Sequence, residues 1–377
     1  MLLLALLVVS GCGSGDQQTS NNQAQQGDDE GEAEEVNLDL KTAAEVMDYV
    51  KNMEPDQRRE VLLQGARKEG GVVSLYSAMS ESQAQAFKNA FERDNPGVTV
   101  DIWRASADEL QVRLVNELRA RSSTVDVIQT LTSYIYELDQ EGAITPYFAP
   151  NIDDFPKELY DPDGKWTAIY VLPNNTAWNT NLLSEADVPN TWEDLADPKY
   201  KGKFSMDVQG GLWLYYLRET RGKEEADALA RRIAANEPRL IRSRSQQVAL
   251  LAAGEYALAP AVYEQYTIQN MEKGAPIDFK YLDGPVLVDT FGGLLSKNAS
   301  HPYGAVLLMD WTFSLEGGQQ TFADMGAVVA LPGIKYSNPR QGVVLKEREI
   351  FELKPEKWGP VLEETYNDYK QIFGLTQ

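Results

Sequence analysis

The sequence predicts an α/β protein, and three observations support this prediction. Between residues 72 and 129, short apolar runs alternate with amphipathic stretches of helical period. The same alternation returns between residues 203 and 259. The length of 377 residues is enough for about two domains, each able to bury a core. The pattern therefore indicates two α/β units.

The elements of the first half follow from spacing and turn residues. Residues 41–69 are predicted to be helical, because apolar side chains recur every three or four residues until Gly70 and Gly71. The strands predicted next are Val72–Tyr76, Val98–Trp103 and Val125–Gln129, and the helices between them are Ser77–Asp94 and Asp108–Arg121. Strands that alternate with helices in this way form a parallel sheet with right-handed crossovers.

The second half repeats this order. The predicted strands are Lys203–Met206 and Tyr256–Ala259, and the predicted helices are Leu212–Arg221, Glu224–Asn236 and Gln246–Ala253. An apolar run from Val286 to Leu295 comes next, followed by helices over Pro302–Ser314 and from about Lys357. No repeat of fixed period is visible, which argues against a solenoid or a propeller.

Composition excludes several functions. The chain has 35 basic and 57 acidic residues, a net charge of −22, whereas binding to nucleic acid needs a surplus of basic residues. One Cys and one His rule out a disulfide within the chain and a zinc site of four Cys or His ligands. A Ser-His-Asp triad would depend on His301 alone, and its place before Pro302 is typical of a helix start.

The N-terminus predicts the location. Leu2–Val9 is apolar but much shorter than the roughly 20 residues that span a bilayer, so residues 1–11 are predicted to be a signal peptide. Val9-Ser10-Gly11-Cys12 resembles the bacterial lipobox, which implies lipidation of Cys12. Lipid chains on Cys12 would anchor the protein in the cell envelope, facing the periplasm or the cell exterior.

Residues 12–37 are predicted to form a disordered acidic tether. Residues 13–40 contain eight acidic side chains and no basic one, and the tract up to Val36 lacks aromatic residues. Such a composition cannot bury enough apolar surface to offset the entropy of ordering the chain.

Seven short segments, each different from the others, follow one another along the chain. They are Gly70–Ser77, Asp126–Thr130, Asp197–Lys203, Ala253–Leu258, Lys273–Pro276, Lys297–Pro302 and Ser314–Gln319. Each has a local interpretation, for example a helix that ends in Gly before a strand. In this order they resemble extracellular solute-binding proteins of bacterial ABC importers, in the ferric-iron-like branch.

The resemblance implies a two-lobed fold in which each lobe is a mainly parallel sheet flanked by helices, with crossing strands between the lobes. Residues 38–174 and 288–345 would form lobe 1, residues 175–287 lobe 2, and residues 346–377 a C-terminal helical segment. It also implies a monomer that is not an enzyme, that holds a small solute between its lobes, and that docks on an ABC permease with its ATPase.

Candidate ligand contacts follow the predicted strands, because open α/β sheets bind ligands beyond the carboxyl ends of their strands. They are Ser77, Arg104, Ser106 and Thr130 in the first half, and Asp207, Trp213, Arg244, Ser245 and Tyr263 in the second. Hydroxyls, helix-start amides and Arg suit an anion, so a small organic or phosphorus-containing anion is predicted. The structural alternatives are an N-cap for Ser106 and surface ion pairs for the Arg residues.

Two other functions stay open. The resemblance implies that ferric relatives bind Fe(III) through two adjacent Tyr, but Glu264-Gln265 stands at that position here. A ferric site would therefore use Tyr263, Tyr266 and Tyr134, and no other cofactor is predicted. A surface hydrolase is the alternative from another class, although no nucleophile motif or phosphate-binding Gly-rich loop is present.

Overall fold

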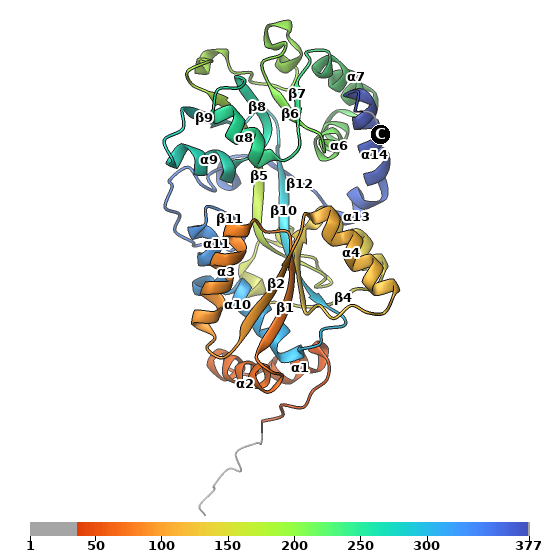
Figure 1. Ribbon diagram of the computed structural model, residues 1–377, viewed down its shortest axis with the longest axis vertical. Helices are drawn as coiled ribbons and strands as arrows, with labels where there is room; N and C mark the ends of the chain where they lie inside the picture. Colours follow the sequence, from red (N-terminus) through yellow and green to blue (C-terminus); the bar gives the residue numbers. More distant parts are fainter. Residues whose placement is uncertain (1–35, 376–377) are drawn as a thin grey trace, which may run out of the picture. The chain divides into compact units, whose positions relative to one another are not determined.

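Three parallel strands form one edge of the main sheet. The computed structural model describes residues 36–375, so the predicted signal peptide, Cys12 and nearly all of the predicted tether lie outside the described residues. β1 (Val72–Ser77) lies between β2 (Thr99–Arg104) and β3 (Val127–Leu131), and both neighbours run parallel to it (Figure 1). This is the parallel pairing predicted for residues 72–129.

Helices lie near the predicted places with shifted boundaries. α3 (Glu81–Asp94) begins four residues later than predicted, because Ser80 and Gln83 form a capping box at its start. The predicted N-terminal helix is two helices, α1 (Ala43–Val50) and α2 (Pro55–Lys68). The proline that opens α2 fits a first helical turn but interrupts a helix that runs into it.

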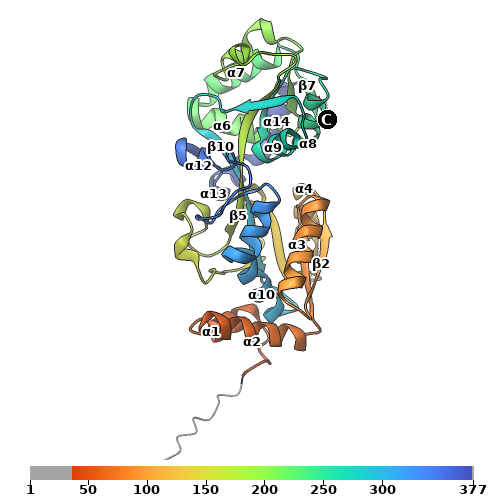
Figure 2. The same ribbon diagram turned by 90° about the vertical axis from the view of Figure 1, so that its left-hand side faces the viewer.

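Two long strands run through both halves of the molecule. β5 (Thr167–Asn179) and β10 (Val286–Ser296) are buried at every residue. The first part of β5 pairs with β10 and β11 (Val328–Val329), and its last part pairs with β8 (Leu258–Tyr263) and β9 (Ile277–Lys280), all antiparallel. Figures 1 and 2 show β5 passing between the two groups of elements that we call the first and second lobes.

The first lobe is built on the strand order β11-β5-β10-β3-β1-β2. Its largest hydrophobic cluster contains side chains from α1, α2, α3 and the sheet. Its other elements include α4 (Ala107–Arg119), η1 (Thr132–Tyr134), α5 (Ile135–Gln140), β4 (Ile144–Thr145), α10 (Pro302–Phe313) and α11 (Gln320–Asp324). After α10, non-helical torsion angles at Gly317 interrupt the helical path before α11.

The second lobe has its own core. Two hydrophobic clusters, one around Trp213 and one around Val248, fill it. A parallel pair, β6 with β7, accompanies the antiparallel pairs made with β5. Besides β8 and β9, the elements include β6 (Ser205–Asp207), α6 (Gly211–Arg221), α7 (Lys223–Ala234), β7 (Arg239–Ile241), α8 (Arg244–Ala252) and α9 (Glu264–Glu272).

The C-terminal segment returns to the second lobe. Its elements are α12 (Val344–Glu347), β12 (Ile350–Glu352), α13 (Pro355–Trp358) and α14 (Leu362–Ile372). β12 pairs in parallel with the start of β10. Trp358, Tyr369 and Phe373 belong to the cluster around Trp213, so the helix predicted from about Lys357 is part of that core.

Candidate functional site

Four of the predicted contact residues lie at or near the carboxyl ends of strands. Ser77 is the last residue of β1, and Thr130 is the last but one of β3. Asp207 ends β6, and Tyr263 ends β8. Ligands of open α/β sheets bind at this end of the strands.

Arg244, the first residue of α8, is the centre of a buried polar cluster. Its side chain is only 10% exposed. Nε donates a hydrogen bond to the Ala261 carbonyl oxygen at 3.1 Å, Nη1 donates to the Tyr263 hydroxyl, and the guanidinium carbon lies 4.4 Å from the centre of the Tyr263 ring. Asp207 Oδ2 lies 3.7 Å from Nε. We call Asp207, Arg244, Tyr263 and Asp289 the arginine cluster.

Asp289, on β10, completes the arginine cluster. The Tyr263 hydroxyl donates to Asp289 Oδ2 at 3.0 Å. Burial raises the pKa of Asp289, although Arg244 and the Tyr263 hydrogen bond oppose that rise. Burial also raises the pKa of Tyr263 well above its usual value. Burial alone would lower the pKa of Arg244, but Tyr263, Asp207 and Asp289 raise it, so Arg244 stays charged.

The backbone beside Arg244 is strained. Ser243, directly before it, has φ 89°, and Ala261, whose carbonyl accepts from it, has φ 55°. Left-handed torsion angles are costly for residues with a Cβ, by about 1–3 kcal/mol each, and they concentrate at functional sites. Within residues 36–375 only two other non-glycine residues, Arg121 and Glu237, have positive φ.

Buried hydroxyls without partners lie close in the chain to Tyr134 and Asp289. The hydroxyl oxygens of Thr130, Thr132, Ser133 and Thr290 are all buried and lack a hydrogen-bond partner in the described part of the chain. Native proteins rarely leave buried polar atoms unpaired, so each such group calls for a water or a ligand.

Tyr134 links these hydroxyls to the arginine cluster. Burial raises its pKa, a hydrogen bond with Tyr366 lowers it, and the charges of Asp289 and Arg244 also act on it. Burial raises the pKa of Tyr366, on α14, and so do Tyr134 and Asp207, whereas Arg244 lowers it. Side chains from the first lobe, the second lobe and the C-terminal segment thus meet here.

Other predicted contacts lie elsewhere. Arg104 donates to Glu81 Oε2 at 3.0 Å and to the Met79 carbonyl at 2.9 Å. Ser106 is exposed at the N-cap of α4, and Ser245 is exposed. Trp213 is buried in the second-lobe core, with its ring 5.5 Å from that of Trp192.

The tyrosines of the ferric alternative are only partly together. The rings of Tyr263 and Tyr266 lie 5.9 Å apart, and Tyr134 joins Tyr263 through their shared neighbours Arg244 and Asp289. Glu264 already accepts from Tyr281 and from the Gly342 amide. No group of three or more His, Cys, Asp or Glu suited to a metal occurs in the described residues.

The single His has a structural partner. Its Nδ1 lies 2.8 Å from Asp126 Oδ2, and its backbone amide donates to Asp126 Oδ1 at 2.9 Å. His301 is the N-cap residue of α10, as its place before Pro302 predicts.

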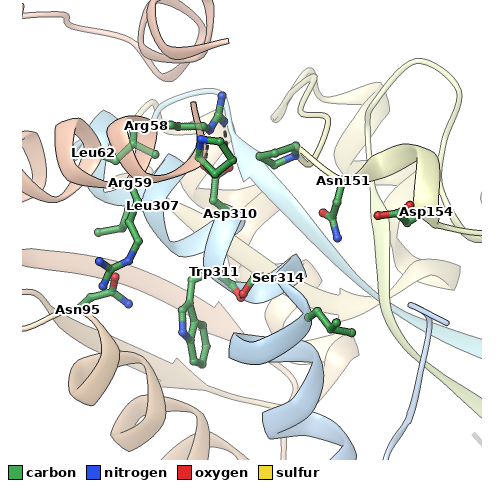
Figure 3. A pocket seen from close by; sticks show the side chains of 13 residues that line it. Arg58, Arg59, Leu62, Asn95, Asn151, Asp154, Leu307, Asp310, Trp311 and Ser314 are labelled. Atoms are coloured by element: carbon green, nitrogen blue, oxygen red, sulfur yellow. Dashed lines mark hydrogen bonds and ion pairs between the residues drawn. The ribbon is translucent and has the colours of Figure 1, made fainter. Parts of the chain in front are cut away.

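A pocket of about 490 Å³ lies apart from the arginine cluster, in the first lobe (Figure 3). α2 and α10 supply most of its walls, with Trp311 and Leu307 among the apolar side chains. The ion pair between Arg58 and Asp310, with 2.6 Å between Nε and Oδ2, crosses one side of it.

Asp289 and Tyr366 are not among the contacts predicted from the sequence. Asp289 lies inside an apolar run, and an acidic residue interrupting a buried strand was the available signal. Tyr366 gave no signal, because its place in the site depends on how α14 folds back on α6.

Comparison with known proteins gives the class. Residues 122–342, more than half of the chain, match the family model described as bacterial extracellular solute-binding protein. The chain therefore belongs to that family of binding proteins, and it is not an enzyme. The family membership also confirms the predicted class of ABC importer component.

Two of the relatives that the chain resembles are named for iron. A "Fe(3+)-binding periplasmic protein" of Serratia marcescens is 24% identical over 264 residues, which cover 67% of this chain and 77% of the relative. "Iron uptake protein A1" of Synechocystis is 26% identical over 133 residues, 35% of this chain and 36% of the relative.

Solved structures share the two-lobed fold. Iron-bound HitA of Pseudomonas aeruginosa matches with a TM-score of 0.70 and 21% identity, covering 80% of this chain and 99% of its own. AfuA of Actinobacillus pleuropneumoniae with bound fructose-6-phosphate matches with a TM-score of 0.71 and 19% identity, covering 81% and 99%. Among the described helices, none is long and apolar enough to cross a membrane.

Proposed function

We propose that this solute-binding protein captures a small anion, organic or phosphorus-containing, at the arginine cluster between its lobes and delivers it to an ABC permease. The observation that carries the proposal is Arg244, a buried cation of the second lobe that is joined through Tyr263 to Asp289 of β10. Arg binds carboxylate and phosphate oxygens through paired hydrogen bonds.

The start of α8 supplies further donors for an anion. Asp207 and Asp289 lie close to Arg244, and burial raises the pKa of Asp289 against the opposing effects of Arg244 and Tyr263. Arg244 also begins α8, and Ser243 makes no side-chain cap, so the first amides of α8 lack a side-chain acceptor. Free amides at a helix start and a partial positive charge both favour an anion.

Ferric iron is the second candidate, favoured by the iron-binding names of several relatives. Tyr263, Tyr266 and Tyr134 would supply the oxygen ligands. Burial raises the pKa of all three, so iron would have to displace their protons. For this reason we place iron below the anion.

A thermal-shift screen tests the choice. Purified protein is heated with inorganic phosphate, citrate, hexose 6-phosphates or ferric citrate. A solute at 100 times its dissociation constant adds about 2.7 kcal/mol to the free energy of unfolding. Stabilisation by an iron-free anion supports the proposal. Stabilisation only by ferric citrate, with a visible tyrosinate band, would reverse the order.

We further propose a monomer with residues 1–11 as signal peptide, residues 12–37 as tether and a lipid anchor on Cys12, which would hold the protein on the outer side of the membrane. Residues 38–174 and 288–345 remain the proposed lobe 1, and residues 175–287 the proposed lobe 2. Labelled palmitate should enter the wild-type protein in bacterial cells but not the Cys12→Ser variant. Equal labelling of both proteins would rule out a lipid anchor on Cys12.

A further inference from the structure

The C-terminal segment, from α12 to α14, contacts both lobes. β12 pairs with β10 where β10 passes between the lobes. α14 packs on α6, and Arg218 of α6 binds Asp368 of α14 with 2.6 Å between Nη2 and Oδ2. Figure 1 shows α13 at the junction between the lobes.

Gly359 makes the contact with the first lobe. A Cβ placed on it would lie 2.2 Å from Cγ of Tyr136, so only a glycine fits against that ring. The preceding residue, Trp358, packs on Tyr215 of the second lobe at 5.0 Å between ring centres. Two consecutive residues of the C-terminal segment therefore touch opposite lobes.

α14 reaches the arginine cluster from the other side. The Tyr369 hydroxyl donates to the Asp207 carbonyl oxygen at 2.6 Å. One turn earlier, Tyr366 lies over Gly211, where an added Cβ would come within 2.6 Å of its ring. The Tyr366 ring also packs on Trp358 at 5.8 Å. Tyr366 and Tyr134 of the first lobe affect each other's pKa, so the two side chains are neighbours.

We infer that the C-terminal segment completes the solute site: Tyr366 forms one wall of it and contacts the anion held by Arg244, and the Gly359–Tyr136 contact fixes that wall against the first lobe. This inference rests on the proposed function for its ligand. A purely structural segment would stabilise the second lobe without touching either the first lobe or the solute.

A ligand-free experiment tests the contact with the first lobe. In Gly359→Val, the new side chain collides with Tyr136, so amides of Thr132–Gln140 should exchange with deuterium at least fivefold faster than in the wild type. Lys357→Val, an exposed change on the same segment, should leave that exchange unchanged. If amides of Thr132–Gln140 exchange at the wild-type rate in a folded Gly359→Val variant, the proposed contact between Gly359 and the first lobe is wrong.

A binding experiment tests the wall, with fructose 6-phosphate as the probe. Tyr366→Ala should weaken binding about tenfold or more, and Tyr366→Phe should show how much of the loss belongs to the hydroxyl. Near-ultraviolet circular dichroism checks that each variant is folded. Wild-type affinity in Tyr366→Ala would overturn the role of Tyr366.

The two hypotheses fail in different ways. If the wild-type protein binds neither this probe nor any other iron-free anion, the proposed solute class is wrong. The inference is then decided by exchange at Arg244–Gln247 in Tyr366→Ala. Faster exchange there supports Tyr366 as a wall of the site, and unchanged exchange removes it.

Discussion

The side chain of Arg244 is held in place by contacts within the protein. Its Nε is shared between the Ala261 carbonyl and Asp207, its Nη1 bonds Tyr263, and the Tyr263 ring lies under the guanidinium. These contacts fix the side chain in one position before any ligand arrives. A pre-ordered cation loses little entropy on binding, which favours affinity.

Substitution at this residue tests that role. Arg244→Ala should weaken anion binding by about 100-fold, because a charge-assisted pair contributes on the order of 1.5–3 kcal/mol. Tyr263→Phe removes the bond to Asp289 and should cost less. Isothermal titration measures both, with Arg242→Ala, an exposed neighbour, as control. Unchanged affinity in both variants would remove them from the site.

Glu352 is a second residue whose environment predicts behaviour. It lies on β12 beside β10, its Oε1 has no partner within the described residues, and burial raises its pKa to about 8. The folded state therefore holds a proton on Glu352 that the unfolded chain releases above its ordinary pKa. Stability must fall as pH rises from about 4.5 to about 8.

Glu352→Gln should remove that fall. We expect the melting temperature of the variant to match the wild type at pH 4 and to exceed it by ~3 °C or more at pH 9. Calorimetry across this range measures the difference. A gap that does not widen with pH would mean that Glu352 is ionised in the folded protein.

At the scale of elements, α2 and α10 pack so closely that one position of α2 requires glycine. A Cβ on Gly65 of α2 would lie 2.2 Å from Cγ of Tyr303 of α10. Replacing a helical Gly by Ala usually stabilises a protein, by about 0.5–1 kcal/mol. Here the two helices would have to separate, so the sign reverses.

Gly65→Ala should therefore destabilise the protein, by about 1–3 kcal/mol in urea unfolding. Gln57→Ala, on the exposed side of the same helix, should change stability by less than about 0.5 kcal/mol. A stabilised Gly65→Ala variant would show that α10 yields without cost.

Whether an element was predicted correctly depends on how clearly periodicity and turn residues mark it in the sequence. β1, β2 and α4 lie within about two residues of their predictions, because period and turn residues mark them. β5 escaped prediction, since thirteen residues buried on both faces show no alternation. α1 and α2 were fused, because their apolar spacing continues across the break at Pro55.

In the whole molecule, each lobe has its own core, while the arginine cluster joins Asp289 of β10 to Arg244 of the second lobe. A solute bound there should slow deuterium exchange in Thr130–Tyr134 and in Arg244–Gln247 together, because both segments border it. Protection confined to one of them would contradict a site shared by the two lobes.

The sequence by itself determined the α/β class, the order of most elements and the strand ends that carry Ser77, Thr130, Asp207 and Tyr263. These depend on period, turns and caps, which act over a few residues. Only the tertiary structure decided that β5 serves both lobes, and that Asp289 and Tyr366 join Arg244. Those contacts link residues far apart in the chain, and their stability depends on burial and pairing that no local pattern records.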